Sequence, residues 1–405
     1  MRRSTIIRVA SLAGVILVSI VLALAPSAST ASWSHCAAGS DVADKGGVRG
    51  LFVAGANQTN PMVVTAEKKF LLNDKTICGA NLVIPWSAID RGPDAKPRYN
   101  WSFLEKAAAP WEAAGKIVNL IVWGTDEVIY NEVNRYGEEC PVDIIDGPDS
   151  CHSATPRYVL ATTKTVNCGR KAGTEIPVYW EPGYEKPWRA FQAALVAHVA
   201  NDSDIGYIRF GLGTGGEDFP STGFEEGRCS EQWTTDGLTA ARWLRWSISQ
   251  VKYEASLHSN HPLNVGIGSF PGAPTLPERV ATSAARHNMG FGFQGMTVDQ
   301  IHLDESNPAL CYAGWCHLFK TWTGHVPLEI QTLAPTDPGG EGYTGALPPL
   351  SNVVTKAHAQ VLELYPQEWL VADDPEWPTY KMYHQEYARV LAQAASEIGG
   401  QAGIK

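Results

Sequence analysis

The sequence predicts a (β/α)₈ TIM barrel, an α/β fold, behind an export leader. Short apolar runs rich in β-branched residues alternate with helical patterns, eight such runs can be counted, and no Pro/Ser-rich linker divides them. Alternating strands and helices are typical of a parallel sheet. Eight units favour a closed barrel, with a doubly wound open sheet as the rival fold.

The first 31 residues have the pattern of a secretory signal peptide. Three arginines precede an apolar run from Val9 to Ala25, and Ser29-Thr30-Ala31 offers a cleavage site of small residues. A membrane anchor is the competing reading, because the run is nearly long enough for a short span. We expect residues 32–405 to form one secreted, extracellular catalytic domain without stable membrane insertion, in an oligomeric state that the sequence leaves open.

Each predicted strand is a short apolar run followed by a Gly- or Pro-rich loop. Helical patterns follow most of them; in the clearest, Trp101, Leu104, Ala108 and Trp111 recur on one face. A long insertion, about 124–186, interrupts the alternation after the third run and should wall a binding cleft. The eight predicted strands are Gly50–Gly55, Gly79–Trp86, Lys116–Trp123, Ile205–Gly213, Leu263–Phe270, Gly290–Met296, His325–Thr332 and Gln360–Pro366.

The helical patterns complete the alternation. They cover residues 65–73, 100–115, 186–201, 237–255 and 277–288, with a weaker one near 311–322 and a last one around 377–398.

Eight cysteines remain after the leader, and an even number in an exported chain is typical of disulfides. Pairing by proximity predicts Cys140–Cys151 and Cys311–Cys316. The chain has no C-x-x-C pair, and His317 has no second histidine at ligand spacing. We therefore expect neither a metal site nor a cofactor.

The charge of the chain argues against polyanionic partners. Without the leader's three arginines, 29 basic residues face 42 acidic ones, a net charge of −13. Such a surface repels phosphate backbones and anionic lipid, so we expect no nucleic-acid partner. Neutral carbohydrates fit better, since aromatic rings such as those of the 14 tryptophans can stack on sugars, although most of them should be core.

Two glutamates follow barrel strands where chemistry is expected. Working residues of such barrels sit at the carboxyl ends of strands. Glu217 comes just past the fourth predicted strand, and Glu329 is placed at the end of the seventh. A pair of carboxyl groups facing each other is what glycoside hydrolysis requires, one giving a proton to the leaving oxygen and one remaining ionised.

The stretch GLGTGGED (Gly211–Asp218) also contains the G-x-G-x-x-G spacing of dinucleotide-binding loops. Such a loop should turn directly into a helix, but Pro220 and Gly223 follow and forbid one. The glycines are better explained as backbone freedom beside Glu217.

The segment RYNWSFLEKAAAPWEAAGKIVNLIVW (Arg98–Trp123) resembles the second helix and third strand of retaining (β/α)₈ glycosidases of clan A. This resemblance implies a glycoside hydrolase, with Glu217 as acid/base and Glu329 as nucleophile. The chain departs from the clan at Gly216, where an Asn that binds the 2-hydroxyl usually precedes the acid/base residue.

A second segment, IRFGLGTGGEDFPST, is similar to the β-amylase stretch whose Gly-Glu pair supplies the general acid. It implies an inverting hydrolase of α-glucans as the alternative. A non-catalytic carbohydrate-binding barrel is the alternative from another class, in which the two glutamates would not face each other.

Substrate-binding candidates follow the same strand-end rule. Trp86 and Trp123 end the second and third predicted strands, Gln294 lies in the sixth, and Trp369 follows the eighth. Asp126, after the third strand, could bind sugar hydroxyls. Core packing is the other explanation for the tryptophans, and an exposed loop is the other explanation for Asp126.

Overall fold

A computed structural model describes residues 36, 48–57, 67–125, 130–131, 151–168, 175–225, 227–268, 270–296, 315–332, 335–336 and 359–400. All of them belong to the unit Trp33–Lys405. The expected signal peptide, residues 1–31, lies outside the described part. Among the described residues, no helix combines the length and the apolar character that crossing a bilayer requires.

Eight parallel strands close into a barrel in the order β1-β12-β11-β10-β9-β8-β3-β2. Every predicted strand is present, so the expected TIM barrel is confirmed. Neighbouring strands of the ring follow one another along the chain. Their numbers skip from β3 to β8 because the insertion between these two strands holds four short strands outside the barrel. The barrel strands are β1 Gly50–Val53, β2 Ile77–Pro85, β3 Ile117–Trp123, β8 Ile205–Phe210, β9 Leu263–Ile267, β10 Gly290–Met296, β11 Leu328–Thr332 and β12 Val361–Leu364.

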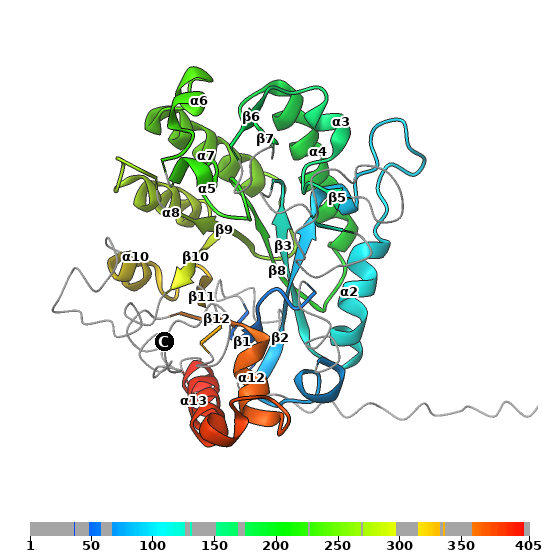
Figure 1. Cartoon of the computed structure of the whole chain (residues 1–405), viewed down its shortest axis with the longest axis vertical. Coiled ribbons are helices and arrows are strands. Elements are labelled where there is room, and N and C mark those ends of the chain that lie inside the picture. Colours follow the sequence, from blue (N-terminus) through cyan, green and yellow to red (C-terminus); the bar gives the residue numbers. More distant parts are fainter. Residues whose placement is uncertain are drawn as a thin grey trace, which may run out of the picture. The chain divides into compact units, whose positions relative to one another are not determined.

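Helices lie around this barrel (Figure 1). In α2 the buried residues are Leu104, Ala108 and Trp111, the face that the sequence pattern predicts. The N-cap of α7 is Thr239, whose side chain accepts a hydrogen bond from the Arg242 amide. The helices between barrel strands are η2 Glu67–Leu71, η3 Trp86–Ala88, α2 Ser102–Ala113, α4 Pro182–Val199, α5 Thr222–Glu225, α6 Ser230–Thr235, α7 Ala240–Ala255, α8 Leu276–Arg286 and α10 Trp315–Trp322.

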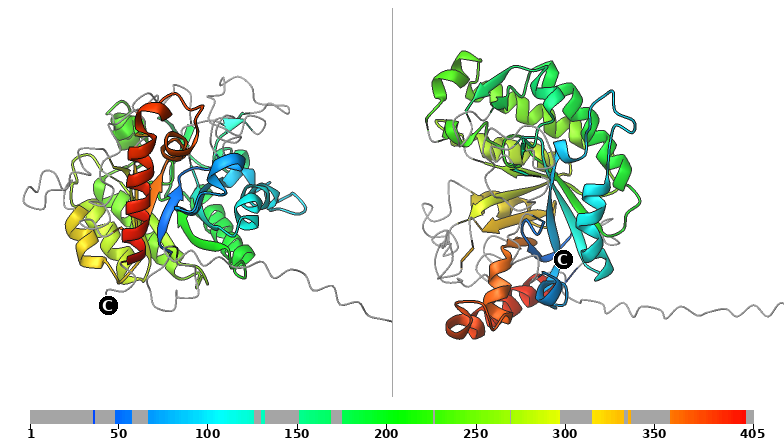
Figure 2. Two further views of the ribbon diagram at one scale, coloured as in Figure 1. Left: turned by 90° about the horizontal axis from the view of Figure 1, so that it is seen from below. Right: turned by 45° about the vertical axis from the view of Figure 1, so that its right-hand side comes forward.

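The chain ends in two helices that pack on each other, α12 Pro366–Asp373 and α13 Tyr380–Gly400, coloured orange and red in Figure 2. The first of them had no clear sequence pattern.

In the described part of the insertion after β3, the elements are short. They are β4 Tyr130–Asn131, β5 Cys151–His152, α3 Arg157–Leu160, β6 Thr165–Asn167 and β7 Glu175–Pro177. A disulfide joins Cys168 of the insertion to Cys229 in the connection after β8, and another joins Cys36 to Cys78. Both differ from the predicted neighbour pairs. The predicted pairs Cys140–Cys151 and Cys311–Cys316 lie outside the side chains that the structure describes.

Alternate residues of each strand face two different environments. The outward residues, such as Ile208 and Ile330, join the main core beneath the helices. A smaller apolar cluster inside the barrel includes Phe52, Ile121 and Tyr207. Branched apolar side chains usually fill the interior of such barrels, but here charged and amide side chains occupy part of it.

Candidate functional site

A buried arginine occupies the barrel interior between two carboxylates. Arg209, the fifth residue of β8, donates through Nη1 to Oε1 of Glu329 on β11 and to Oε1 of Glu363 on β12, each at 2.9 Å. All three side chains are at most 3% exposed. A buried charge is tolerated when it is paired and hydrogen-bonded, which Arg209 achieves by bridging strands from opposite parts of the sheet.

Amide side chains complete the surroundings of this ion pair. With its oxygen turned toward the guanidinium, the Gln294 amide accepts from Arg209 Nε at 3.2 Å and from Nη1 at 2.7 Å. Asn264 donates to Glu329 Oε2 at 3.5 Å. Gly292 faces Glu329 across the β10–β11 pair, and any Cβ there would overlap the Glu329 side chain. The strand therefore needs glycine for Glu329 to fit inside the barrel.

Hydrogen bonds extend from Glu363 toward the second and third strands. The Tyr207 hydroxyl donates to Glu363 Oε1 at 2.9 Å and accepts from Asn81 Nδ2 at 3.0 Å. Asn119 in turn donates to Asn81 at 2.8 Å. The polar residues thus form one connected set across the barrel rather than separate contacts.

Burial and neighbouring charges act differently on the pKa values of Arg209 and Glu363. Burial lowers the pKa of Arg209, but Glu329 and Glu363 raise it more, so the guanidinium stays charged. Burial raises the pKa of Glu363 to about 7 against the opposing effect of Arg209, and the charge of Glu329 adds to the rise. Near neutral pH, Glu363 can therefore take up a proton that an exposed glutamate would not hold.

Glu329 lies deeper than the sequence predicts. It is the second residue of β11, not its last, and pairs in register with Gly292 and Val361. It is also 1% exposed. The predicted strand and β11 both end at Thr332, so the error was to place Glu329 at the end of a strand that continues for three residues beyond it. On the same face of β11, two residues nearer its carboxyl end, stands Gln331.

Glu217 lies on a tight loop directly after β8. Its amide donates to the Thr214 carbonyl at 3.1 Å, and its own carbonyl accepts from the Gly213 amide at 2.7 Å. Gly216 has a φ of 80°, and a Cβ there would lie 2.9 Å from the indole of Trp123. Glycine is thus required at Gly216 both by the turn and by the close approach of Trp123. The glycines of this stretch therefore shape a bend beside Glu217.

Glu217 interacts electrostatically with a residue from the other side of the ring. Burial raises the pKa of Tyr365, a hydrogen bond from Gln331 lowers it, and the charges of Glu368, Glu363 and Glu217 raise it further. Tyr365 follows β12, which lies four strands from β8 in the barrel order. Gln331 Nε2 donates to the Tyr365 hydroxyl at 3.4 Å. The charge of Glu217 therefore acts on Tyr365 across the carboxyl end of the barrel, and Tyr365 is hydrogen-bonded to Gln331 of the strand that carries Glu329.

The predicted aromatic binding residues separate into two groups. Trp123 is half-buried at the end of β3 beside Gly216, so it shares the mouth with Glu217. Trp86 is fully buried and packs against Tyr184, Trp188 and Phe191, which places it in the core beneath the helices.

The other three predicted binding residues are Trp369, Gln294 and Asp126. Trp369 is fully buried and donates to Thr76, which precedes β2, so it is directed away from the carboxyl end of the barrel. Gln294 is 8% exposed and contacts Arg209, which leaves it supporting the ion pair. Asp126 lies outside the described residues.

Sequence reasoning missed Arg209, Glu363, Gln331 and Tyr365. The first two leave a detectable signal, because each is a charged residue inside a run that is otherwise apolar, IRF and LEL. Such a residue in a strand buried on both faces must point into the barrel and find a partner there. Gln331 and Tyr365 carry no comparable signal.

Comparisons with known proteins find proteins of similar fold but identify no family for this chain. No protein-family model matches the chain, and no curated protein matches it. The catalytic domain of β-amylase from Paenibacillus polymyxa superposes with a TM-score of 0.51 at 14% identity, covering 85% of this chain and 98% of that one. The fold is glycoside-hydrolase-like.

Two further glycosidases match at lower similarity. An endo-β-1,4-xylanase from Gloeophyllum trabeum has a TM-score of 0.45 at 12% identity over 86% of this chain and 96% of its own. A β-galactosidase from Marinomonas ef1 has a TM-score of 0.48 at 12% identity over 86% of this chain and 61% of its own.

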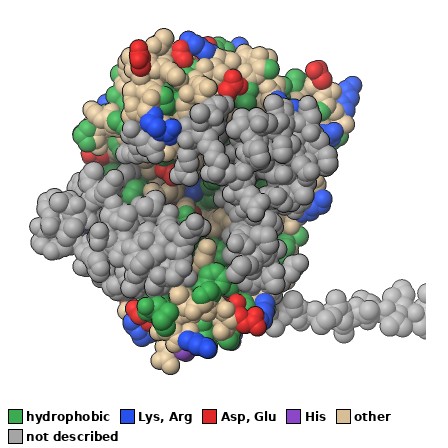
Figure 3. Space-filling view, in the orientation of Figure 1, with side chains coloured by type: hydrophobic (Ala, Val, Ile, Leu, Met, Phe, Trp, Pro, Cys, Tyr) green, Lys and Arg blue, Asp and Glu red, His purple; other side chains and the backbone are tan. Residues whose placement is uncertain are grey.

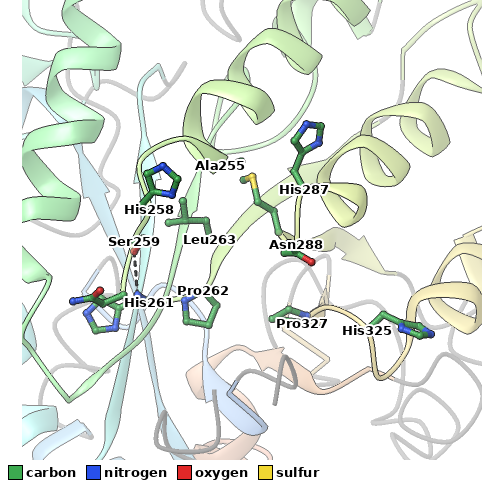
Figure 4. A pocket seen from close by; sticks show the side chains of 12 residues that line it. Ala255, His258, Ser259, His261, Pro262, Leu263, His287, Asn288, His325 and Pro327 are labelled. Atoms are coloured by element: carbon green, nitrogen blue, oxygen red, sulfur yellow. Dashed lines mark hydrogen bonds between the residues drawn. The ribbon is translucent and has the colours of Figure 1, made fainter. Parts of the chain in front are cut away.

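A pocket also exists at the other end of the barrel. Its lining includes Leu263, Met289 and Pro327, which lie at or just before the first residues of β9, β10 and β11. Figure 4 shows four histidines around it, His258, His261, His287 and His325. Within the described residues no group of three or more His, Cys, Asp or Glu side chains could hold a metal ion. Because catalytic residues of these barrels lie at the carboxyl ends of strands, this pocket is separate from the candidate site.

Surface charge is mixed where it can be seen. On the face shown in Figure 3, the acidic and basic side chains of the described residues are interspersed rather than gathered by sign. That distribution differs from the basic stripe of a protein that binds nucleic acid.

Proposed function

We propose that the protein is a secreted glycoside hydrolase that cleaves a neutral oligo- or polysaccharide, with Glu217 as the proton donor and Glu329 as its partner carboxylate. The observation that carries the proposal is that the charge of Glu217 acts on Tyr365, whose hydroxyl accepts a hydrogen bond from Gln331, two residues beyond Glu329 on β11. It brings Glu217 toward the carboxyl end of the strand that carries Glu329, 112 positions later in the sequence.

Each carboxyl group has an environment suited to its role. A general acid must be reachable by the leaving oxygen, and Glu217 is partly exposed at the mouth. The partner must remain ionised, and the Nη1 hydrogen bond of Arg209 stabilises the negative charge of Glu329. Trp123, beside Gly216, offers a ring face on which a sugar can stack.

The depth of Glu329 bears on stereochemistry. The clan A resemblance implies retention, in which the second carboxylate lies about 5–5.5 Å from the first and attacks the sugar itself. Because Glu329 is buried two residues below Gln331 on β11, we propose instead the wider separation of about 6.5–9.5 Å that leaves room for a water. We therefore favour the inverting, β-amylase-like alternative on this point, with Glu329 as the base that activates the water.

The test is hydrolysis of a panel of neutral polysaccharides by the purified protein, followed by NMR of the first-formed anomer. Glu217→Gln and Glu329→Gln are the matched variants, and His258→Ala, at the opposite pocket, is the control that should keep full activity. An inverted anomer supports Glu329 as base, and a retained one supports it as nucleophile. Binding of polysaccharide without hydrolysis by the wild type would replace the proposal by the non-catalytic barrel.

A further inference from the structure

Asp218 follows Glu217 in sequence but is directed into the protein rather than toward the mouth. It is fully buried. Ser247 of α7 contacts its Oδ1 at 2.7 Å, and the Trp243 indole donates to its main-chain oxygen at 3.4 Å. Its second carboxyl oxygen, Oδ2, has no hydrogen-bond partner. Among the described residues, an ionised carboxylate in this place would have only the Ser247 hydroxyl and the Trp243 indole as nearby donors, and no cation.

The two contacts of the Ser247 hydroxyl fit a protonated Asp218. Its oxygen lies 2.7 Å from Asp218 Oδ1 and 3.1 Å from the Trp243 carbonyl, and both of these oxygens are acceptors when Asp218 is ionised. A hydroxyl has one proton and can donate to only one of them. If Asp218 is protonated, it donates to Ser247, and Ser247 donates to the Trp243 carbonyl, so both contacts are hydrogen bonds.

The surroundings of Asp218 also favour the neutral form. Ser247 and Trp243 of α7 contact it, and the end of β9 packs against it at Gly268. Burial raises the pKa of Asp218 to about 8, and the hydrogen bonds from Ser247 and Trp243 oppose this. Among the described residues, no charged or titratable side chain contributes to that shift.

The loop that carries Glu217 is fixed at two places. On one side the Gly215 amide donates to the Thr125 carbonyl after β3, at 2.9 Å. On the other side Asp218 joins the loop to α7. Because Glu217 lies between these attachments, a change at Asp218 moves the residue next to it.

We propose that Asp218 is a positioning residue that acts as a neutral carboxylic acid, joining the Glu217 loop to α7 through Ser247. Its ionisation would place an unpaired charge in the core and release the loop, which sets an upper pH limit for an ordered site. The positioning of a proton donor rests on the proposed hydrolase function, but the neutral buried acid does not.

The first test is the pH dependence of unfolding, which requires no substrate. A native pKa raised above the unfolded value stabilises the fold at low pH, and that stabilisation is lost as the pH rises through the native pKa. Between the unfolded and native pKa values of Asp218, the folding equilibrium constant of the wild type should therefore lose up to about tenfold per pH unit through this group. Asp218→Asn keeps the shape of the side chain and a donor to Ser247, and it should remove the contribution of Asp218 to the pH dependence of folding.

Asp94→Asn, at an exposed position, is the matched control and should leave the slope unchanged. Infrared difference spectra of wild type against Asp218→Asn at pH 6 should show the band of a protonated carboxyl group. The same slope in Asp218→Asn and wild type, or no such band, would overturn the neutral acid.

The second test addresses positioning. On a substrate with a poor leaving group, kcat at pH 6 should stay near wild type in Asp218→Asn and fall at least about tenfold in Asp218→Leu and Ser247→Ala, as expected when a proton donor is displaced. On a substrate with an activated leaving group all three should match the wild type. Equal losses on both substrates would leave Asp218 a purely structural residue. If the wild type hydrolyses none of the substrates, the unfolding and infrared results still decide whether Asp218 is a neutral acid.

Discussion

Glu329 and Glu363 accept hydrogen bonds from the same nitrogen, Nη1 of Arg209, each at 2.9 Å. One guanidinium therefore faces two carboxylates in the barrel interior, and the group carries a net negative charge when both are ionised. A low-dielectric interior opposes such an excess, and a proton on Glu363 relieves it. Because burial and the charge of Glu329 raise the pKa of Glu363, Glu363 is the member of the set expected to take up that proton.

We expect Glu363→Gln to flatten the pH dependence of stability. The pKa of Glu363 is raised to about 7 in the folded protein, so its contribution is present at acid pH and is lost as the pH rises toward 7. The wild type should lose up to about 1.4 kcal/mol of unfolding free energy per pH unit through this group between about pH 4.3 and 7. Chemical denaturation at several pH values measures it. Glu278→Gln, on the exposed surface of α8, is the control that should keep the wild-type slope.

We expect Arg209→Met to destabilise the fold by about 3–5 kcal/mol at neutral pH, because it leaves two buried carboxylates without their cation. Combining it with Glu329→Gln and Glu363→Gln should recover much of this loss, since no charge then remains in the barrel. Urea unfolding of the single and triple variants makes the comparison. A single variant as stable as the wild type would mean that the carboxylates do not depend on Arg209.

We expect Glu217→Gln to discriminate between leaving groups. A glutamine cannot give a proton, so hydrolysis of natural substrates should fall by about 10²–10⁴. Substrates with very good leaving groups need no proton and should be spared. Steady-state kinetics with both substrate types, and circular dichroism to check the fold, provide the measurement. Equal losses on the two types would exclude Glu217 as the acid.

We expect Trp86→Ala to reduce stability and Trp123→Ala to weaken substrate binding. Trp86 is fully buried, so its loss should cost about 3–5 kcal/mol of stability while KM stays unchanged in the folded fraction. Trp123 lies at the mouth, so its replacement should raise KM or weaken polysaccharide binding with a smaller effect on stability. Thermal unfolding and kinetics on both variants separate the roles. An unchanged KM in Trp123→Ala would remove this residue from the site.

Strand patterns predicted the barrel well because they depend on local chemistry. Each buried strand is a short apolar run ended by glycine or proline, and eight of them alternate with helices, which fixes the fold class. Boundaries were less certain: α12 was not foreseen, and the seventh strand begins at Leu328, three residues later than predicted. The carboxyl end at Thr332 agrees with the prediction, and Glu329 lies in the interior because it stands three residues before that end.

The candidate site was predictable only in part. Glu217 was predicted from its place after a strand and a glycine turn, both local signals, and the structure places it on the loop after β8. Trp86 and Trp369 also follow strands, but packing against helices placed them in the core. Strand-end position alone could not distinguish a ring at the mouth from a ring beneath a helix, because that depends on which neighbours approach.

The amino-acid sequence by itself determined the eight-unit alternation, the insertion after the third strand and the acidic residue beyond the fourth. All of these follow from periodicity and turn chemistry within short segments. Only the tertiary structure decided that Arg209 is shared by Glu329 and Glu363, that Tyr365 interacts with Glu217, and that Cys168 pairs with Cys229. These partners lie on strands and loops distant in the chain, and closure of the sheet brings them together.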